Sequence, residues 1–477
     1  MTALWTSGEI AAAVGGAAHG DFEASGVAFD SREVEPGHLF VAMKGEATDG
    51  HRFLDKVFAA GAAGAVVSEP VERPHVRVAD TAAALDALGR AARGRTSARI
   101  CGVTGSAGKT GTKEALHAAL DRFAPGSAHR SVKSYNNHVG VPLSLARMPR
   151  ESRFGVFEMG MNHAGELAAL TRLVRPHVAI VTAIASAHRA FFSSEEEIAD
   201  AKGEIFQGLE EGGIALVPFD SPYRDRLAAA ARPYAGRVLS FGLGEGADIR
   251  ARDVVAAPGG GSLVTATLPG AELTFTVSQP GDHWVSNALA VLGAVEALGG
   301  DLAQAGLALA DLPGLKGRGE RHLIRVAGGE ALLVDESYNA NPASMAATLK
   351  AFAGLSPAGR RIAVLGGMKE LGDSSDEFHA GLAGPVEAAG IDLAILVGEE
   401  MAALAKALGA KVKMAHVPDT ATAIELARAE ARPGDAILVK GSNSVGLAAL
   451  VEALAAGPSI HSGRPPAAAE GVGTGKS

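Results

Sequence analysis

Short apolar runs that alternate with helical segments leave this chain few possible folds. From residue 99 onward the runs lie at 100–103, 155–158, 178–183 and 214–217. After a Pro- and Gly-containing stretch at 313–319, a second series follows at 332–335, 362–365, 393–397 and 437–440. Strands buried on both faces have this pattern, because helices cover both sides of a parallel sheet. The sequence therefore predicts an α/β protein with two doubly wound parallel sheets.

The length of 477 residues suggests about three domains, and the pattern changes place their boundaries. We expect domains at 1–96, 97–313 and 314–456, followed by a disordered tail at 457–477 that is rich in Gly, Pro, Ala and Ser. The expected elements of the first domain are strands at 27–29, 39–41 and 65–67 and helices at 53–60 and 81–95.

A further change of pattern follows the first series of strands. Apolar residues alternate with a period of two at 262–268 and 272–277, which predicts an antiparallel hairpin added to the parallel sheet. A helix is expected to begin near Trp284, since Leu289, Leu292 and Val295 have helical spacing.

Composition excludes several classes of function. The formal net charge of −9 disfavours a nucleic-acid or anionic-membrane partner, because phosphate binding requires a basic face. The only cysteine, Cys101, lies in an apolar run, so neither a disulfide framework nor a cysteine metal site is expected. The first residues lack a basic segment, and no uncharged apolar stretch reaches the length of a membrane span. We therefore expect a cytoplasmic protein that does not insert into membranes.

One loop carries the strongest functional signal. It follows an apolar strand and precedes a helix, and its residues are Thr104, Gly105, Ser106, Ala107, Gly108, Lys109 and Thr110. Small residues at a helix N-terminus let backbone N–H groups converge on phosphate oxygens. Lys109 supplies a cation for the β- and γ-phosphates, and the Thr110 hydroxyl is suited to Mg²⁺. Val103 stands where the common phosphate-loop pattern has its first glycine, and the alternative is a glycine-rich turn that binds nothing.

Motifs along nearly the whole chain up to the tail resemble the Mur ligases and their relatives, the folylpolyglutamate synthetases. The loop has the form TGSxGKT, and further matching segments lie at 135–142, 158–162, 187–188, 201–206, 281–289 and 317–320. The resemblance implies a small N-terminal α/β domain for a uridine nucleotide, a central ATPase domain, and a C-terminal Rossmann-like domain.

The resemblance also implies a site for ATP and Mg²⁺, with catalytic residues Lys109, Glu158, His188 and Lys202. Glu158 ends an apolar run, which is where open α/β sheets bind ligands, and its carboxylate suits Mg²⁺ opposite Thr110. The family implies His188 as a further metal ligand and Lys202 as a carbamate, which converts a cation into an anion. Taken alone, a histidine beside a strand is more often structural, and a helical lysine is usually a solvated surface residue.

The implied nucleotide site extends beyond the loop. The family places Asn287, together with His283, near the adenine, and Arg318 at the nucleotide phosphates. Asp335 resembles an aspartate that meets the ribose or the phosphates, and the alternative is a turn or helix-cap residue. Trp284 replaces the asparagine that is usual at its position.

Four segments resemble one branch of the family, which adds D-alanyl-D-alanine to a UDP-N-acetylmuramoyl-tripeptide. They lie at 29–51, 335–345, 365–372 and 440–444. The substrate-binding residues implied by the resemblance are Ser31, Arg32, Asn136, Asn137, Tyr338, Asn339 and Asn341. The chain departs from the branch at Gly367, which replaces an aspartate, and at Asn443, which replaces an arginine. The two departures are interpreted as a paired loss of opposite charges.

The implied reaction uses ATP to convert a carboxylate into an acyl phosphate, which the amine of the dipeptide then attacks. The third domain is expected to close over the site and exclude water. Three alternatives stay open: a folate-dependent ligase of the same superfamily, the ligase that adds the third amino acid, and a nucleotide-dependent switch. The Ser31–Arg32 segment argues against the first, the absence of a D-N-P-R motif against the second, and the Glu158–His188–Lys202 set against the third. A monomer is expected.

Overall fold

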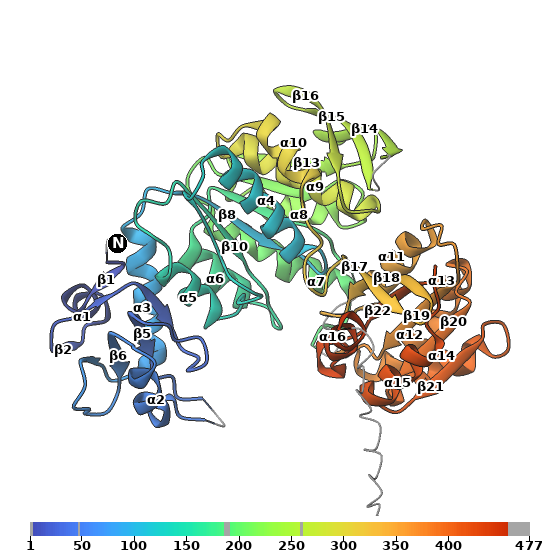
Figure 1. Ribbon diagram of the computed structural model, residues 1–477. Coiled ribbons are helices and arrows are strands. Elements are labelled where there is room, and N and C mark those ends of the chain that lie inside the picture. Colours follow the sequence, from blue (N-terminus) through green and yellow to red (C-terminus); the bar gives the residue numbers. More distant parts are fainter. Residues whose placement is uncertain (1–2, 46–47, 186–190, 258–260, 457–477) are drawn as a thin grey trace, which may run out of the picture.

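The structure, a computed structural model, describes residues 3–45, 48–185, 191–257 and 261–456, and it contains three large sheets along the chain (Figure 1). His188 and the tail at 457–477, for which the sequence made predictions, lie outside the described residues. The α/β class predicted from the apolar runs is confirmed. Within the described residues, no helix is long and apolar enough to cross a membrane.

The N-terminal sheet has five strands in the order β2-β7-β6-β5-β4, all parallel except β2. These strands are β2 (Ala17–His19), β4 (Gly26–Ala28), β5 (His38–Val41), β6 (Gly64–Val67) and β7 (His75–Arg77), and β1 (Trp5–Thr6) pairs separately with β3 (Glu23–Ala24). The helices are α1 (Ser7–Val14), η1 (Gly50–Phe53), α2 (Leu54–Ala59) and α3 (Thr81–Gly94). All three strands and both helices expected here are present, each within a few residues of its predicted bounds.

The central sheet has nine strands in the order β16-β15-β14-β13-β12-β11-β8-β10-β9. They are β8 (Arg99–Thr104), β9 (Ala128–Arg130), β10 (Phe154–Glu158), β11 (Val178–Val181), β12 (Ile214–Pro218), β13 (Arg237–Gly242), β14 (Ile249–Ala256), β15 (Ser262–Leu268) and β16 (Ala271–Val277). The helices are α4 (Lys109–Phe123), α5 (Gly140–Ala146), α6 (Glu166–Val174), α7 (Glu195–Gly203), η2 (Glu204–Gly208), α8 (Arg224–Ala231), α9 (Asp282–Ala297) and α10 (Leu302–Ala310). The predicted antiparallel hairpin is β15 with β16, and it joins the parallel part through β14.

The third sheet has six strands in the order β17-β18-β22-β19-β20-β21. They are β17 (Glu320–Val326), β18 (Gly329–Glu336), β19 (Arg361–Gly366), β20 (Leu393–Val397), β21 (Met414–Val417) and β22 (Ala436–Lys440). The helices are α11 (Pro342–Ala353), η3 (Gly372–Ser374), α12 (Ser375–Gly381), α13 (Ala383–Ala388), η4 (Glu399–Met401), α14 (Ala402–Leu408), α15 (Thr420–Glu430), η5 (Asn443–Val445) and α16 (Ala448–Ala455). The edge strand β17 was not predicted, and it pairs with β18 in antiparallel fashion. As an edge strand, β17 begins with three polar residues and lacks the continuous apolar run of a buried strand.

The N-terminal and central domains share one hydrophobic core. Its members include Val27 and Leu39 from the N-terminal sheet and Phe157 and Val217 from the central sheet. Helix α3 lies between the two sheets in Figure 1 and packs against α5. The third sheet has its own cores on its two faces. Both of these cores consist of residues of the third domain alone.

Candidate active site

The glycine-rich loop forms a cradle at the N-terminus of α4. Gly108 precedes the helix with φ +83°, and no side chain caps the first turn of α4. A Cβ atom at Gly108 would lie 2.9 Å from Asn287 Oδ1, so the residue must be small as well as left-handed. The uncapped N–H groups at this helix end suit the oxygens of a phosphate.

Lys109 is partly buried, not the exposed loop lysine that its position in the loop suggested. Its ammonium donates to the carbonyl of Gly105 at 2.7 Å. Burial lowers the pKa of Lys109, and the nearby carboxylate of Glu158 offsets only part of this effect. The side chain therefore already lies folded back over the cradle in which a phosphate would bind.

Glu158, at the end of β10, is held by two neighbours. The Thr110 hydroxyl donates to Glu158 Oε2 at 2.8 Å, and Asn136 Nδ2 donates to Oε1 at 2.8 Å. The side chain is 1% exposed. A buried carboxylate beside a hydroxyl is an oxygen-rich pair of the kind that Mg²⁺ prefers. The structure thus brings Thr110 to Glu158, as expected from the sequence, and adds Asn136 as a second neighbour of this carboxylate.

Lys202, near the end of α7, is 1% exposed, so it is not a solvated surface lysine. Burial first, and then the positive charge of Lys109, hold the pKa of Lys202 well below its usual value. Among the described residues, no carboxylate forms an ion pair with this amine. His188 lies outside the described residues, so its predicted role as a metal ligand stays a prediction.

Lys113 is a buried cation of the site that sequence reasoning missed. Its side chain is fully buried, and its ammonium donates to the carbonyls of Ser131 and Lys133 at 2.9 and 2.8 Å. It pairs with Glu114 at 2.9 Å and lies 4.0 Å from Glu158 Oε2. The available signal was its spacing, since a residue three positions after Thr110 lies on the same side of the helix.

Replacing Lys113 with methionine is expected to destabilise the protein by about 3 kcal/mol. The buried Glu158 carboxylate would lose a nearby cation, and the carbonyls of Ser131 and Lys133 would lose their hydrogen-bond donor. The measurement is the free energy of unfolding from urea titration. The matched control is Lys411→Met, since Lys411 is 66% exposed and pairs only at the surface; its expected change is within about 0.5 kcal/mol. Equal stability of the two variants would contradict a buried role for Lys113.

A cavity of about 830 Å³ extends from the phosphate loop to the third domain. From the central domain its lining includes most of the loop and Glu158, Lys202, His283 and Asn287. From the third domain it includes Arg318, Tyr338, Asn339 and Asn341. The basic side chains in the lining are Lys109, Lys202, Arg318, Lys369 and Lys440, and the acidic ones are Glu158, Glu336 and Glu370. Lys109 at the phosphate loop and Arg318 from the third domain supply positive charge that suits a polyanion such as a nucleoside triphosphate.

The structure shows the surroundings of several residues that were predicted to contact the nucleotide. Arg318 lies over the ring of Tyr338, with its guanidinium carbon 4.1 Å from the ring centroid. Burial lowers the pKa of His283 to about 4, so its ring is neutral at pH 7. Trp284 packs on α4, where a Cβ atom at Gly111 would lie 2.8 Å from its ring. The residue that departs from the family pattern therefore covers the helix of the phosphate loop.

Asp335 does not line the cavity. It is 2% exposed, and its carboxylate accepts hydrogen bonds from the N–H groups of Gly317 and Ser337 at 2.9 and 3.0 Å. This is the turn role that the sequence left open as the alternative. Asp335 therefore acts here on the turn that carries Arg318.

The predicted substrate residues fall into two groups. Tyr338, Asn339 and Asn341 line the cavity, and Asn341 Nδ2 also donates to the carbonyl of Ser106 at 3.4 Å. Ser31, Arg32 and Asn137 are not in the lining: Arg32 pairs with Asp30 at 2.6 Å, and Asn137 Oδ1 accepts the N–H of Gly140 at 2.9 Å. Two predicted loop residues, Thr104 and Gly105, are likewise absent from the lining.

Lys440 and Glu336 were also missed as members of the site. Lys440 is 3% exposed, donates to the carbonyl of Asn339 at 3.0 Å, and pairs with Glu336 at 3.4 Å. Burial lowers the pKa of Lys440, and Glu336 opposes this shift. Both residues end adjacent parallel strands, β22 and β18, and that alignment was the signal that could have revealed them.

The two departures in the third domain lie close together. The N–H of Ser442, the neighbour of Asn443, donates to the carbonyl of Gly367 at 3.1 Å. A Cβ atom at Gly367 would lie 3.0 Å from Glu400 Oε2, and Glu400 forms an ion pair with Lys369. An ion pair between Glu400 and Lys369 therefore lies beside Gly367, where the family has an aspartate.

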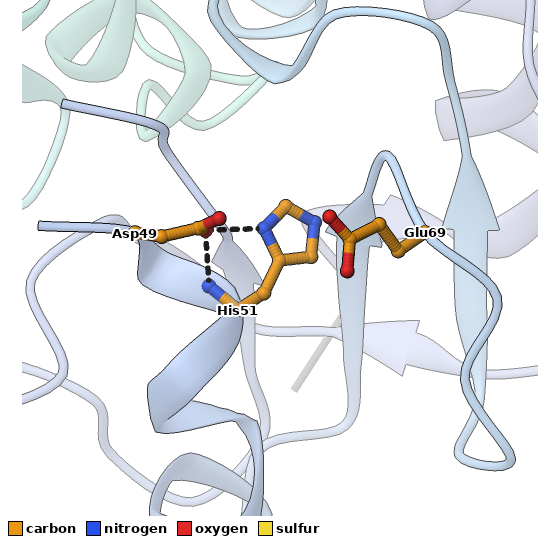
Figure 2. A group of neighbouring side chains, drawn as sticks. All are labelled: Asp49, His51 and Glu69. Atoms are coloured by element: carbon orange, nitrogen blue, oxygen red, sulfur yellow. Dashed lines mark hydrogen bonds and ion pairs between the residues drawn. The ribbon is translucent and has the colours of Figure 1, made fainter.

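A second group with metal-ligand chemistry lies in the N-terminal domain (Figure 2), and its members are Asp49, His51 and Glu69. The ring of His51 uses both nitrogens: Nδ1 bonds Asp49 at 2.6 Å, and Nε2 accepts the N–H of Ser68 at 2.9 Å. Lys44 pairs with Glu69 at 3.0 Å. With both ring nitrogens engaged, His51 connects Asp49 to the residue that follows β6 and does not offer a free nitrogen as a metal ligand.

The geometry defines a nucleotide-dependent α/β enzyme of three domains, and comparisons with known proteins place it in a family. Residues 23–116 match the Mur ligase family catalytic domain, 103–295 the Mur ligase middle domain, and 317–443 the Mur ligase glutamate ligase domain. The chain belongs to the Mur ligase family.

Individual relatives match over most of their length. The UDP-N-acetylmuramoyl-tripeptide--D-alanyl-D-alanine ligase of Bacillus subtilis is 34% identical over 91% of this chain and 93% of the relative. A crystal structure of MurF from Acinetobacter baumannii has a TM-score of 0.81 and 31% identity, covering 95% and 99% of the two chains. MurF from Thermotoga maritima, in complex with ADP, has a TM-score of 0.75 and 28% identity, covering 90% and 97%.

Proposed function

We propose that this protein is an ATP-dependent ligase that joins D-alanyl-D-alanine to a UDP-N-acetylmuramoyl-tripeptide. The observation that carries the proposal is the cavity that extends from the phosphate loop to the wall formed by Tyr338, Asn339 and Asn341. A nucleotide switch needs only the loop, whereas this cavity has room for a second reactant. The name of the relative from Bacillus subtilis, which states both the tripeptide and D-alanyl-D-alanine, supports the choice of substrates.

The reaction brings two anions together, and the residues of the cavity counter their repulsion. The carboxylate of the tripeptide attacks the γ-phosphorus of ATP, ADP leaves, and an acyl phosphate forms. Lys109 and the N-terminus of α4 hold the phosphates, and Arg318 approaches from the third domain. The amine of the dipeptide then attacks the acyl carbon and loses a proton, and phosphate leaves with the C–O bond electrons.

The residues at the end of β10 fit a divalent cation. Glu158 is buried, and among the described residues its oxygens contact the neutral donors Thr110 and Asn136, with Lys113 no closer than 4.0 Å. Thr110, Glu158 and Lys202 as a carbamate, together with His188, would hold Mg²⁺, which neutralises phosphate charge when bound. Because the Thr110 hydroxyl and the Glu158 carboxylate already contact each other, the protein itself orients these two oxygen ligands.

The third domain is proposed to exclude water from the acyl phosphate. Asn341 already reaches Ser106, and Lys350 of α11 pairs with Asp282 of α9 at 2.9 Å. These polar contacts can break and reform without exposing a hydrophobic core. We also propose that the second domain begins at residue 97 and the third at residue 314. The protein is proposed to be cytoplasmic and to be a monomer, and analytical ultracentrifugation tests its oligomeric state.

Coupled ADP release is the direct test. The purified protein is assayed with ATP, Mg²⁺, D-alanyl-D-alanine and a UDP-muramoyl-tripeptide ending in diaminopimelate or lysine. Release of ADP is expected only when both substrates are present, with one phosphate formed per ADP. Glutamate in place of the dipeptide serves as the control for the folate-type alternative, and stimulation by glutamate instead would overturn the proposed substrates.

A further inference from the structure

Glu33 joins the N-terminal domain to a loop of the central domain. It follows Ser31 and Arg32 directly, and its side chain is 19% exposed. Tyr135 donates from its hydroxyl to Oε1 at 2.5 Å, and Arg147 donates from Nη2 to Oε2 at 3.4 Å. Lys133 forms an ion pair with the same carboxylate. Three donors that converge on one partly buried carboxylate fix its geometry better than a single surface ion pair does.

The other side of this loop reaches Glu158. Residues 131–139 contain no helix or strand, and both backbone and side-chain hydrogen bonds hold this loop. Asn136 follows Tyr135 directly and donates to Glu158 Oε1 at 2.8 Å. Its carbonyl accepts the N–H of Gly160 at 2.8 Å. A continuous path thus runs from Ser31–Arg32 through Glu33, Tyr135 and Asn136 to Glu158.

The loop conformation needs this support. Lys133 has φ +52°, in the left-handed region that residues other than glycine rarely adopt. Its carbonyl accepts a hydrogen bond from Lys113, and the ring of Tyr135 packs 5.7 Å from that of Phe29. Burial, reinforced by Glu33, raises the pKa of Tyr135 to about 12, so the phenol keeps the proton that it donates.

We propose that Glu33 is a positioning residue for the ligase reaction, which fixes Asn136 and Glu158 relative to the Ser31–Arg32 turn. This inference rests on the proposed function, with the reacting carboxylate near Glu158, and on the placement of the uridine diphosphate at Ser31–Arg32 that the family resemblance implies. UDP alone would occupy only the Ser31–Arg32 end of the path, whereas the UDP-muramoyl-tripeptide would span the path from Ser31–Arg32 to Glu158. Loss of Glu33 is therefore expected to impair the reaction of the UDP-muramoyl-tripeptide and to leave the affinity for UDP unchanged.

The variants Glu33→Ala and Tyr135→Phe test the proposal, with Glu35→Ala as the matched control because its carboxylate is 78% exposed. For each of the two test variants, kcat/KM for the UDP-muramoyl-tripeptide is expected to fall about tenfold or more, since small misplacements of reacting groups are costly. The Kd for UDP, measured by calorimetry, and the KM for ATP are expected to stay at wild-type values. The control is expected to match wild type in all three measurements.

A double-mutant cycle shows whether Glu33 acts through Asn136. When Asn136→Ala is already present, adding Glu33→Ala is expected to cost little further activity, because the coupled group is gone. Fully additive losses, a parallel loss of UDP affinity, or normal kinetics in both test variants would each overturn the inference while wild type remains active. A wild type that releases no ADP with both substrates would overturn the proposed function, and the inference with it.

Discussion

Lys202→Arg is expected to inactivate the ligase as completely as Lys202→Ala, by about 10³-fold in kcat, which is the scale of removing a preorganised electrostatic group. The side chain is buried next to Lys109, and burial and that charge keep the pKa of Lys202 well below its usual value. A lowered pKa means that the neutral amine exists at a pH where an exposed lysine is charged. That amine can attack CO₂ and lose a proton, which gives a carbamate anion. An arginine keeps its charge and cannot react in this way.

The carbamate would satisfy the buried site in two ways. Its negative charge pairs with Lys109, and its oxygens suit Mg²⁺ beside Thr110 and Glu158. Activity is therefore expected to fall in CO₂-free buffer, to recover with bicarbonate, and to recover more fully as the pH rises. The protein incubated with ¹³C-labelled bicarbonate is expected to show a carbamate resonance that Lys202→Arg lacks.

Lys56→Arg is the control for these measurements, since Lys56 is an exposed lysine on helix α2. It is expected to retain both the resonance and full activity. An active Lys202→Arg variant, together with a wild type that shows no carbamate resonance, would end the carbamate hypothesis.

Lys109→Ala is expected to lower kcat by at least about 10³-fold, because the variant loses the cation that meets the β- and γ-phosphates during transfer. The cost to folding is expected to be about 1 kcal/mol, since the ammonium makes one hydrogen bond, to Gly105. ADP release and thermal unfolding measure the two effects separately. Lys316→Ala is the control, because Lys316 is 75% exposed and pairs at the surface with Glu452. Near-normal turnover by a folded Lys109→Ala variant would contradict the phosphate role.

The sequence by itself determined the α/β class, the position of the phosphate loop and the placement of Glu158 at a strand end. These features depend on neighbours within one strand–loop–helix unit, where spacing along the chain fixes spacing in space. The antiparallel hairpin was equally readable, since β15 and β16 are joined by a short turn and alternate with period two. Edge strand β17 could not be predicted from the sequence, because an edge strand need not be apolar throughout.

Only the tertiary structure decided which residues far apart in the sequence meet. Glu33 and Tyr135 are 102 positions apart, and Lys440 and Asn339 are 101 apart, so no local pattern relates them. The same holds for burial: Lys113 and Lys202 read as ordinary helical lysines until packing removed them from water. Asp335 lies one residue before the end of β18, close to the strand end that the sequence predicted, but the arrangement of Gly317 and Ser337 directed its carboxylate to the backbone. Hydrogen bonds and desolvation act through space, so their partners become known only when the domains are assembled.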